Sequence, residues 1–246
     1  MTRRVAKLGR SVIVYDDTII SQINADLFEP VNWPNAETVP GYSGGRGATL
    51  FINHQGDDWV LRHYHRGGMV GRFLRDQYLW LGPGQSRPCI EWDLLAELQK
   101  QGLPAPVPVA ARYVRHGIYY TADLITRRLP DVVPLSRRMK IAPLKQAVWR
   151  AVGSCIRLFH DSKVNHVDLN AHNLQIGDDD RVWLLDFDRG RIMRRGGKWQ
   201  QENLHRLRRS FRKISQDGHV AFSDQEWRWL IEAYESELKP SQTPRA

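Results

Sequence analysis

Three polar side chains in the second half of the chain have the types and the spacing that phosphoryl transfer requires. Asp168 is followed five residues later by Asn173, and Asp186 comes after an apolar run. In this chemistry one carboxylate orients the attacking hydroxyl, while an amide oxygen and a second carboxylate hold Mg²⁺ against the phosphates of a nucleotide. The pattern therefore predicts Asp168 as a catalytic residue and Asn173 and Asp186 as metal ligands.

The segment between the two expected ligands must bring them together. Residues 174–185 alternate apolar and polar side chains around a Gly-Asp turn, which predicts a β-hairpin. Asn173 and Asp186 stand at its two ends, so the hairpin would place them side by side. The alternative is that these are ordinary solvated loop residues. A His-x-Asp triplet, an asparagine, a hairpin and an Asp-Phe-Asp sequence together nevertheless form a rare combination.

A glycine-rich stretch near the N-terminus is a candidate phosphate-binding loop. It occupies residues 41–48 and precedes two predicted strands over 49–52 and 59–64. Glycines in such a turn let backbone N–H groups approach phosphate oxygens without a side chain in the way. In this position the stretch predicts a loop that covers the nucleotide. Its candidate contacts are Gly44, Gly45, Arg46 and Gly47.

The remaining elements follow from hydrophobic periodicity and from the positions of proline and glycine. Their order is similar to that of the protein-kinase-like superfamily. It predicts an α+β fold with two lobes, in which an antiparallel sheet plus one helix form residues 1–126 and a mainly helical catalytic lobe forms residues 127–246. The predicted elements are helices over 88–100, 143–160, about 204–214 and 223–238, strands over 110–113 and 118–125, and a proline-containing crossing segment over 130–134.

Composition narrows the class of protein and its partners. The chain has 246 residues, 41% of them hydrophobic, and a formal net charge of +9. A chain of this kind folds, and its charge implies an anionic partner. No apolar run approaches the ~18 residues that a membrane-spanning helix needs, and no secretory signal precedes the first strands. No nucleic-acid-binding signature accompanies the basic residues, so nucleic acid is not expected as a partner.

The motifs resemble those of the lipopolysaccharide-core kinases, and most closely the kinases of 3-deoxy-D-manno-octulosonic acid (Kdo). The most specific part of the resemblance is the Arg-His-Tyr-His-Arg-Gly-Gly stretch at residues 62–68. The resemblance implies ATP- and Mg²⁺-dependent phosphorylation of a Kdo hydroxyl, the 4-OH in the family, on a Kdo–lipid A precursor. It also implies a peripheral protein at the cytoplasmic side of the inner membrane.

The resemblance assigns two further charged residues. Glu91 matches the helix glutamate that steadies a cationic residue on a neighbouring strand. Arg62 stands where protein kinases have a lysine, and no lysine occurs between Lys7 and Lys100 to replace it. Arginine and lysine are not interchangeable at such a site. Two alternatives follow: either Arg62 pairs with Glu91 and touches the nucleotide phosphates, or this contact is rearranged.

Two more positions are implied near the nucleotide. Leu124 and Ile125, after Asp123 on a predicted strand, are expected to bind adenine through their backbone. The Asp186-Phe187-Asp188 sequence departs from Asp-Phe-Gly at its third position, which makes Asp188 a candidate for a second acidic group near the metal.

The last third of the chain bears on the acceptor. Residues 189–213 hold ten Lys or Arg against one acidic residue, next to an apolar stripe. This pattern predicts contact with an anionic membrane surface, and the alternative is a solvated face over a core-packed helix. The absence of an Ala-Pro-Glu motif favours a small or carbohydrate acceptor over a peptide. The alternatives to a Kdo kinase are a kinase of another core sugar, such as heptose, and a pseudokinase that only binds.

Overall fold

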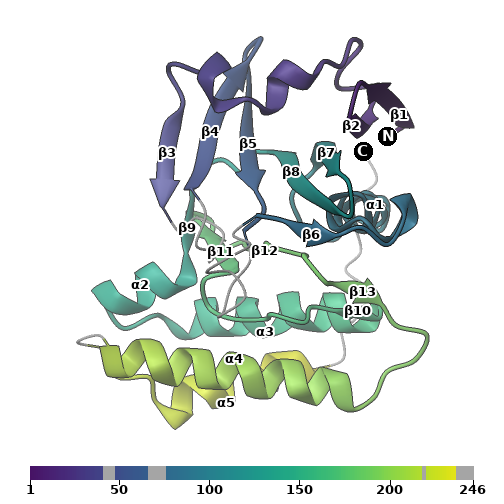
Figure 1. Ribbon diagram of the computed structural model, residues 1–246. Coiled ribbons are helices and arrows are strands. Elements are labelled where there is room, and N and C mark those ends of the chain that lie inside the picture. The colour runs from purple at the N-terminus through teal and green to yellow at the C-terminus, as the bar shows by residue number, and fades with distance from the viewer. Residues whose placement is uncertain (41–47, 66–75, 218–219, 237–246) are drawn as a thin grey trace, which may run out of the picture.

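The computed structural model describes residues 1–40, 48–65, 76–217 and 220–236, and it has two lobes (Figure 1). The upper lobe is built on an antiparallel sheet, and the lower lobe is mainly helical. The predicted α+β class is therefore confirmed. The sheet contains, in spatial order, β1 (Arg3–Leu8), β2 (Ser11–Asp16), β7 (Pro108–His116), β8 (Tyr119–Arg127), β5 (Asp57–His63), β4 (Ala48–His54) and β3 (Glu37–Pro40), and the short β6 (Tyr78–Leu79) also pairs with β8.

Both faces of this sheet are covered. Helix α1 (Arg87–Lys100) packs on one face through a buried row that includes Trp92, Leu95 and Leu98. The other face is covered by the segment that contains two 3₁₀ turns, Ala25–Phe28 and Pro30–Asn32. Since side chains alternate along a strand, each central strand contributes to two separate apolar clusters.

The sequence did not predict the strands at the two edges of the sheet, β1 and β3. Strand β1 is exposed along nearly its whole length and has the sequence Arg-Arg-Val-Ala-Lys-Leu. It has no alternation of apolar and polar residues that would reveal a strand. Basic side chains are common on edge strands because they discourage pairing with another chain.

The lower lobe is organised around α3 (Gln146–Asp161), which begins three residues later than the sequence predicts. It packs on α5 (Asp224–Glu235) at Gly153, where an added Cβ atom would lie 2.1 Å from the backbone oxygen of Leu230. Trp149 on α3 donates a hydrogen bond of 3.1 Å to Glu226 on α5. Glu226 also closes the N-terminal capping box of its own helix with Ser223. In the part of the chain that the structure describes, the lower lobe also contains α2 (Leu135–Ile141), which the sequence did not predict, and α4 (Lys198–Asp217).

The predicted hairpin forms and belongs to a small second sheet. Strands β11 (Leu174–Gly177) and β12 (Val182–Leu184) pair antiparallel, and β9 (Val132–Pro134), part of the predicted crossing segment, adds to β11. A further pair, β10 (Val164–Asn165) and β13 (Arg191–Ile192), flanks the loop that carries Asp168. The predicted lobe boundary at residues 126 and 127 falls at the end of β8.

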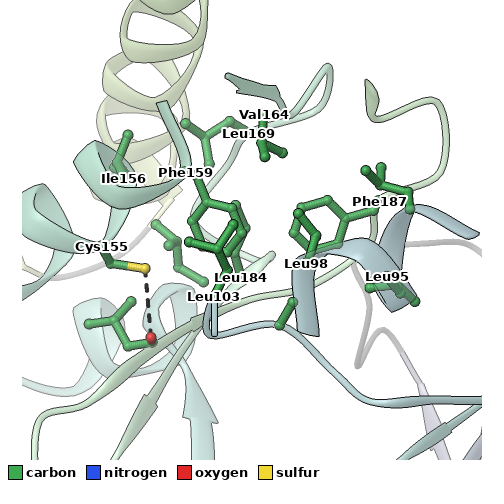
Figure 2. Packing of buried hydrophobic residues seen from close by; sticks show 14 of the residues in the cluster. Leu95, Leu98, Leu103, Cys155, Ile156, Phe159, Val164, Leu169, Leu184 and Phe187 are labelled. Carbon is green, nitrogen blue, oxygen red and sulfur yellow. Dashed lines mark hydrogen bonds between the residues drawn. The ribbon is translucent and has the colours of Figure 1, made fainter. Parts of the chain in front are cut away.

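A single apolar cluster joins the two lobes (Figure 2). Phe187 lies against Leu98 of α1, and its ring centroid is 5.7 Å from that of Phe159 on α3. The edge of His166 also meets Phe187, at 5.0 Å between ring centroids. This packing fixes α1 of the upper lobe relative to the Asp186-Phe187-Asp188 segment of the lower lobe, which we call the metal loop. Among the described helices, none has the length and apolarity to cross a bilayer.

Candidate active site

The loop after β10 exposes the Asp168 side chain to solvent, while hydrogen bonds within the loop hold the Asp168 backbone. The side-chain amides of Asn170 and Asn173 each donate a hydrogen bond of 2.9 Å to the carbonyl oxygen of Asp168. His166 is buried, and its Nε2 lies 2.8 Å from the carbonyl oxygen of Leu185. Within the described part of the chain, the Asp168 carboxylate makes no hydrogen bond or ion pair. It is therefore an exposed acceptor on a rigid loop.

The two expected metal ligands are neighbours at the base of the hairpin. Leu185 donates a backbone hydrogen bond of 2.8 Å to the carbonyl oxygen of Asn173, which places Asp186 next to it in space. The Asn173 side chain is 1% exposed, and its Oδ1 has no hydrogen-bond partner among the described residues. A buried carbonyl oxygen without a partner is costly, and a cation would satisfy it.

This donor set fits Mg²⁺. Amide and carboxylate oxygens are its usual protein ligands, and Mg²⁺ is normally held by one or two carboxylates together with substrate phosphates and water. No group of three or more His, Cys, Asp or Glu side chains that could hold a metal occurs in the described ranges. Asn173 and Asp186 would therefore share the ion with the phosphates rather than enclose it alone.

Arg62 connects β5, α1 and the metal loop. Its Nη2 donates to both carboxylate oxygens of Glu91, at 2.7 and 2.6 Å, and its Nη1 donates to Asp186 Oδ1 at 2.5 Å. The Tyr64 hydroxyl also donates to Glu91. Of the two alternatives for Arg62, the structure shows the pairing with Glu91, and it adds a contact with Asp186 that the sequence did not predict.

The electrostatics of this cluster reflect its burial. The side chains of Arg62 and Glu91 are 16% and 3% exposed. Burial raises the pKa of Glu91 to about 7, although the adjacent guanidinium opposes this shift. Burial disfavours the charge on Arg62, but the carboxylates of Glu91 and Asp186 outweigh that effect and raise its pKa well above the usual value.

The structure places Asp188 against a basic residue of α1. Arg87, the first residue of α1, donates through Nε to Asp188 Oδ1 at 2.8 Å and through Nη2 to Oδ2. The guanidinium also lies 4.7 Å from the centre of the Tyr78 ring. Sequence reasoning missed Arg87, because nothing in its own segment points to a carboxylate 101 residues away. This ion pair fixes the start of α1 to the residue two positions after Asp186.

A cleft between the lobes adjoins these residues. Leu124 faces this cleft, whereas Ile125 lies on the opposite face of β8 in the cluster that contains Ile52 and Trp59. The structure therefore does not bring the Ile125 side chain to the cleft. Thr126 also lines it and was missed, although period-two alternation from Leu124 would have selected it. The cleft is lined by Val60, Arg62, Glu91, Leu95, Pro106, Leu124, Thr126, Arg127, Leu129, Leu185 and Asp186.

Two predicted regions remain, the glycine-rich loop and the basic segment that includes α4. The glycine-rich candidates Gly44, Gly45, Arg46 and Gly47 lie outside the residues that the structure describes, so their role stays a prediction. In the basic segment, the apolar stripe of α4 is buried in the core through Leu207, Phe211 and Ile214. That stripe cannot also enter a membrane, so any membrane contact of α4 must come from its charges.

The fold and the site define a kinase-like phosphotransferase. A sheet with one packed helix stands over a helical lobe, and Asp168, Asn173 and Asp186 meet beside a cleft between them. The model of the lipopolysaccharide kinase (Kdo/WaaP) family matches residues 32–234, and the chain belongs to this family. The protein is accordingly a phosphotransferase with an alcohol group as acceptor.

Relatives that share one name cover nearly the same length as this chain. The chain is 36% identical over 225 residues to the 3-deoxy-D-manno-octulosonic acid kinase of Vibrio parahaemolyticus. The aligned residues cover 92% of this chain and 94% of that protein. It is 39% identical over 227 residues to the proteins of the same name from Xanthomonas axonopodis pv. citri and Xanthomonas campestris pv. campestris, in each case over 92% of this chain and 90% of the relative.

Proposed function

We propose that this protein transfers the γ-phosphoryl group of ATP to a Kdo hydroxyl, the 4-OH, of a Kdo–lipid A precursor in lipopolysaccharide core synthesis. The observation that carries the chemistry is the position of Asn173. Its amide nitrogen holds the Asp168 loop at 2.9 Å, and its buried Oδ1 is unpaired in the described structure. The name shared by the relatives supports Kdo as the acceptor.

Each residue of the site has a separate role in the proposed reaction. Asp168 accepts a hydrogen bond from the sugar hydroxyl, aligns it with the phosphorus and takes its proton late in transfer. The exposure of its carboxylate leaves room for a bulky sugar. Asn173 and Asp186 would hold Mg²⁺, and ATP with this ion would supply the electrophilic phosphoryl group. Arg62, held by Glu91, contacts the phosphates.

The apolar part of the cleft accommodates the base. Val60, Leu95, Leu124 and Leu185 provide an apolar lining next to the charged cluster. A planar purine between such side chains buries apolar surface, while backbone groups near the end of β8 supply its hydrogen bonds. This arrangement supports a nucleotide bound with its adenine in the apolar part of the cleft and its phosphates toward Arg62 and Asp186.

The test is labelled-phosphate transfer from ATP to purified Kdo–lipid A precursor with Mg²⁺. We expect the wild type to transfer and Asp168→Asn to retain ATP binding with nearly all transfer lost. Asp178→Asn is the matched control, because this carboxylate is 85% exposed in the hairpin turn. Comparable turnover by Asp168→Asn would refute its role. Transfer only to a heptosylated acceptor would indicate a heptose kinase, and ATP binding without any transfer would indicate a pseudokinase.

We further propose that the protein is peripheral, at the cytoplasmic side of the inner membrane, where its acceptor is assembled. The exposed basic side chains of α4 support an electrostatic contribution. Arg208 is excluded from this set, because it is bound to Asp224 at 2.9 Å, whereas Arg212 pairs with the same carboxylate only at 3.9 Å and is 57% exposed. Neutralising Arg206, Arg209 and Arg212 should weaken binding to anionic vesicles by up to roughly 100-fold, given about 1 kcal/mol for each charge. Unchanged vesicle binding with these charges removed would make α4 a structural element only.

A further inference from the structure

Three large apolar side chains project from one end of the upper lobe. Leu79, Leu81 and Ile118 are 50%, 70% and 64% exposed. Leu79 pairs with Tyr119 between β6 and β8, and the Trp80 backbone N–H donates to the carbonyl oxygen of Ile118 at 2.9 Å. The three side chains therefore belong to adjoining segments, and we call this group the strand-tip patch.

The patch is held in place by the residue at its centre. Trp80 packs against Tyr113 at 4.9 Å and against Tyr120 at 5.9 Å between ring centroids. Its neighbours Leu79 and Leu81 point away from this anchor, as alternation along an extended segment requires. Their exposure is therefore a consequence of the fold.

Apolar exposure continues toward α1 and the edge of the sheet. Val5 on β1 is 56% exposed and Ile90 on α1 is 40% exposed. Both line a hollow together with Pro83, which follows the patch closely in the chain. Several large apolar side chains exposed at the same end of a fold indicate an interaction site.

The charges around the patch are mostly basic, and the acidic side chain in the adjoining hollow, Asp93, is paired with Arg3 at 2.7 Å. The three segments that form this end, residues 3–15, 77–90 and 107–122, contain no Asp or Glu. Lys7, Arg10 and Arg115 are exposed, and none of them pairs with an acidic side chain in the part of the chain that the structure describes. The Arg115 guanidinium lies 5.2 Å from the Trp80 ring, directly beside the apolar group.

These properties favour a lipid surface over other occupants. A second copy pairing through the same patch would bring like charges together, which opposes association. Apolar side chains within a basic rim are the arrangement of an interfacial membrane anchor, with the apolar groups at the acyl boundary and the cations at the phosphates. Strand β13 and the basic segment that leads into α4 lie toward the same side of the molecule as α1 and β1 (Figure 1).

We propose that the strand-tip patch inserts Leu79, Leu81 and Ile118 into the interface of an anionic membrane, with Lys7, Arg10 and Arg115 at the level of the lipid phosphates. This inference deepens the membrane location proposed above. It adds an apolar contact that α4 does not provide, and it does not depend on the identity of the acceptor.

The experiment is sedimentation of the full-length protein with phosphatidylcholine vesicles, with and without phosphatidylglycerol. Replacing Leu79, Leu81 and Ile118 together with serine should lower the partition coefficient on anionic vesicles by about tenfold or more, because the inserted apolar area is lost. The matched control replaces Val31 and Ile141, which are 84% and 72% exposed elsewhere, and it should bind like the wild type. Thermal unfolding confirms that each variant folds.

Each other outcome overturns the proposal. Unchanged partition of the folded triple variant would show that the patch does not enter the membrane. A wild-type dimer that the triple variant abolishes, with no change in vesicle binding, would make the patch a contact between copies. The assay contains neither ATP nor acceptor, so its result is separate from that of the phosphate-transfer test. Transfer to a deacylated, water-soluble Kdo acceptor should be the same in the triple variant and the wild type.

Discussion

Replacing Arg62 with lysine tests the reasoning about the charged cluster most directly. Lysine is the residue that protein kinases have at this position, so Arg62→Lys would be harmless if only a positive charge were needed. In this structure, however, two different nitrogens of Arg62 serve two carboxylates: Nη2 binds Glu91 at 2.6 and 2.7 Å, and Nη1 binds Asp186 at 2.5 Å. A single ammonium on a shorter stem can serve only one of them at this geometry.

The expected cost follows from the contact that is lost. A hydrogen bond to a charged group contributes about 1.5–3 kcal/mol, so Arg62→Lys should lower kcat/KM by roughly 10- to 100-fold. The measurement is steady-state phosphate transfer from ATP with saturating Mg²⁺. Arg150→Lys is the control, since Arg150 is 46% exposed and its pair with Glu232 is on the surface at 3.5 Å. A kcat/KM of Arg62→Lys within twofold of the wild type would refute the claim that both contacts are used.

Three further outcomes are expected. Asn173→Ala should raise the Mg²⁺ concentration needed for half-maximal transfer by about tenfold or more, and an unchanged Mg²⁺ requirement would remove this residue from the metal site. Arg87→Asp should impair transfer, and the charge swap with Asp188→Arg should restore part of it, whereas equal loss in single and double variants would show that the pair itself is not required. Because the pKa of Glu91 is raised to about 7, its contribution to the free energy of unfolding is full below pH about 4.5 and is lost as pH rises through about 7, by roughly 3 kcal/mol. Denaturant titrations should show the wild type losing stability relative to Glu91→Gln between pH 5 and 8, and a constant difference would contradict the shift.

The parts of the fold with strong local patterns were predictable from the sequence. The helix before the Asp168 loop buries one apolar face and the hairpin after Asn173 alternates, and both are found. The helix of residues 88–100 is also found, although it is buried around most of its circumference. The exposed strand β1 and the seven-residue α2 carry no such pattern. Their positions depend on pairing and packing with distant segments, which local periodicity does not reveal.

The site was predictable in its residue types but not in all its pairings. The spacing of Asp168, Asn173 and Asp186 follows from one loop and one hairpin, which are local. The sequence named both Leu124 and Ile125 and could not show which side chain faces the cleft, because both faces of β8 are buried and no polar alternation marks the cleft side. The contacts of Arg62 and Arg87 join residues up to 124 positions apart, so they required the packing of α1 against the lower lobe.

The contact between α3 and α5 has a consequence for how the protein is synthesised. Trp149 reaches its hydrogen-bond partner 77 residues further along the chain, and the backbone of α5 rests directly on Gly153. While the ribosome is still producing the intervening residues, the outer side of α3 remains uncovered. The upper lobe has all of its strands by Arg127 and can begin to form earlier. We therefore expect the nascent helical lobe to be the part that depends on chaperones, because its exposed apolar surface persists until the last helix has been made.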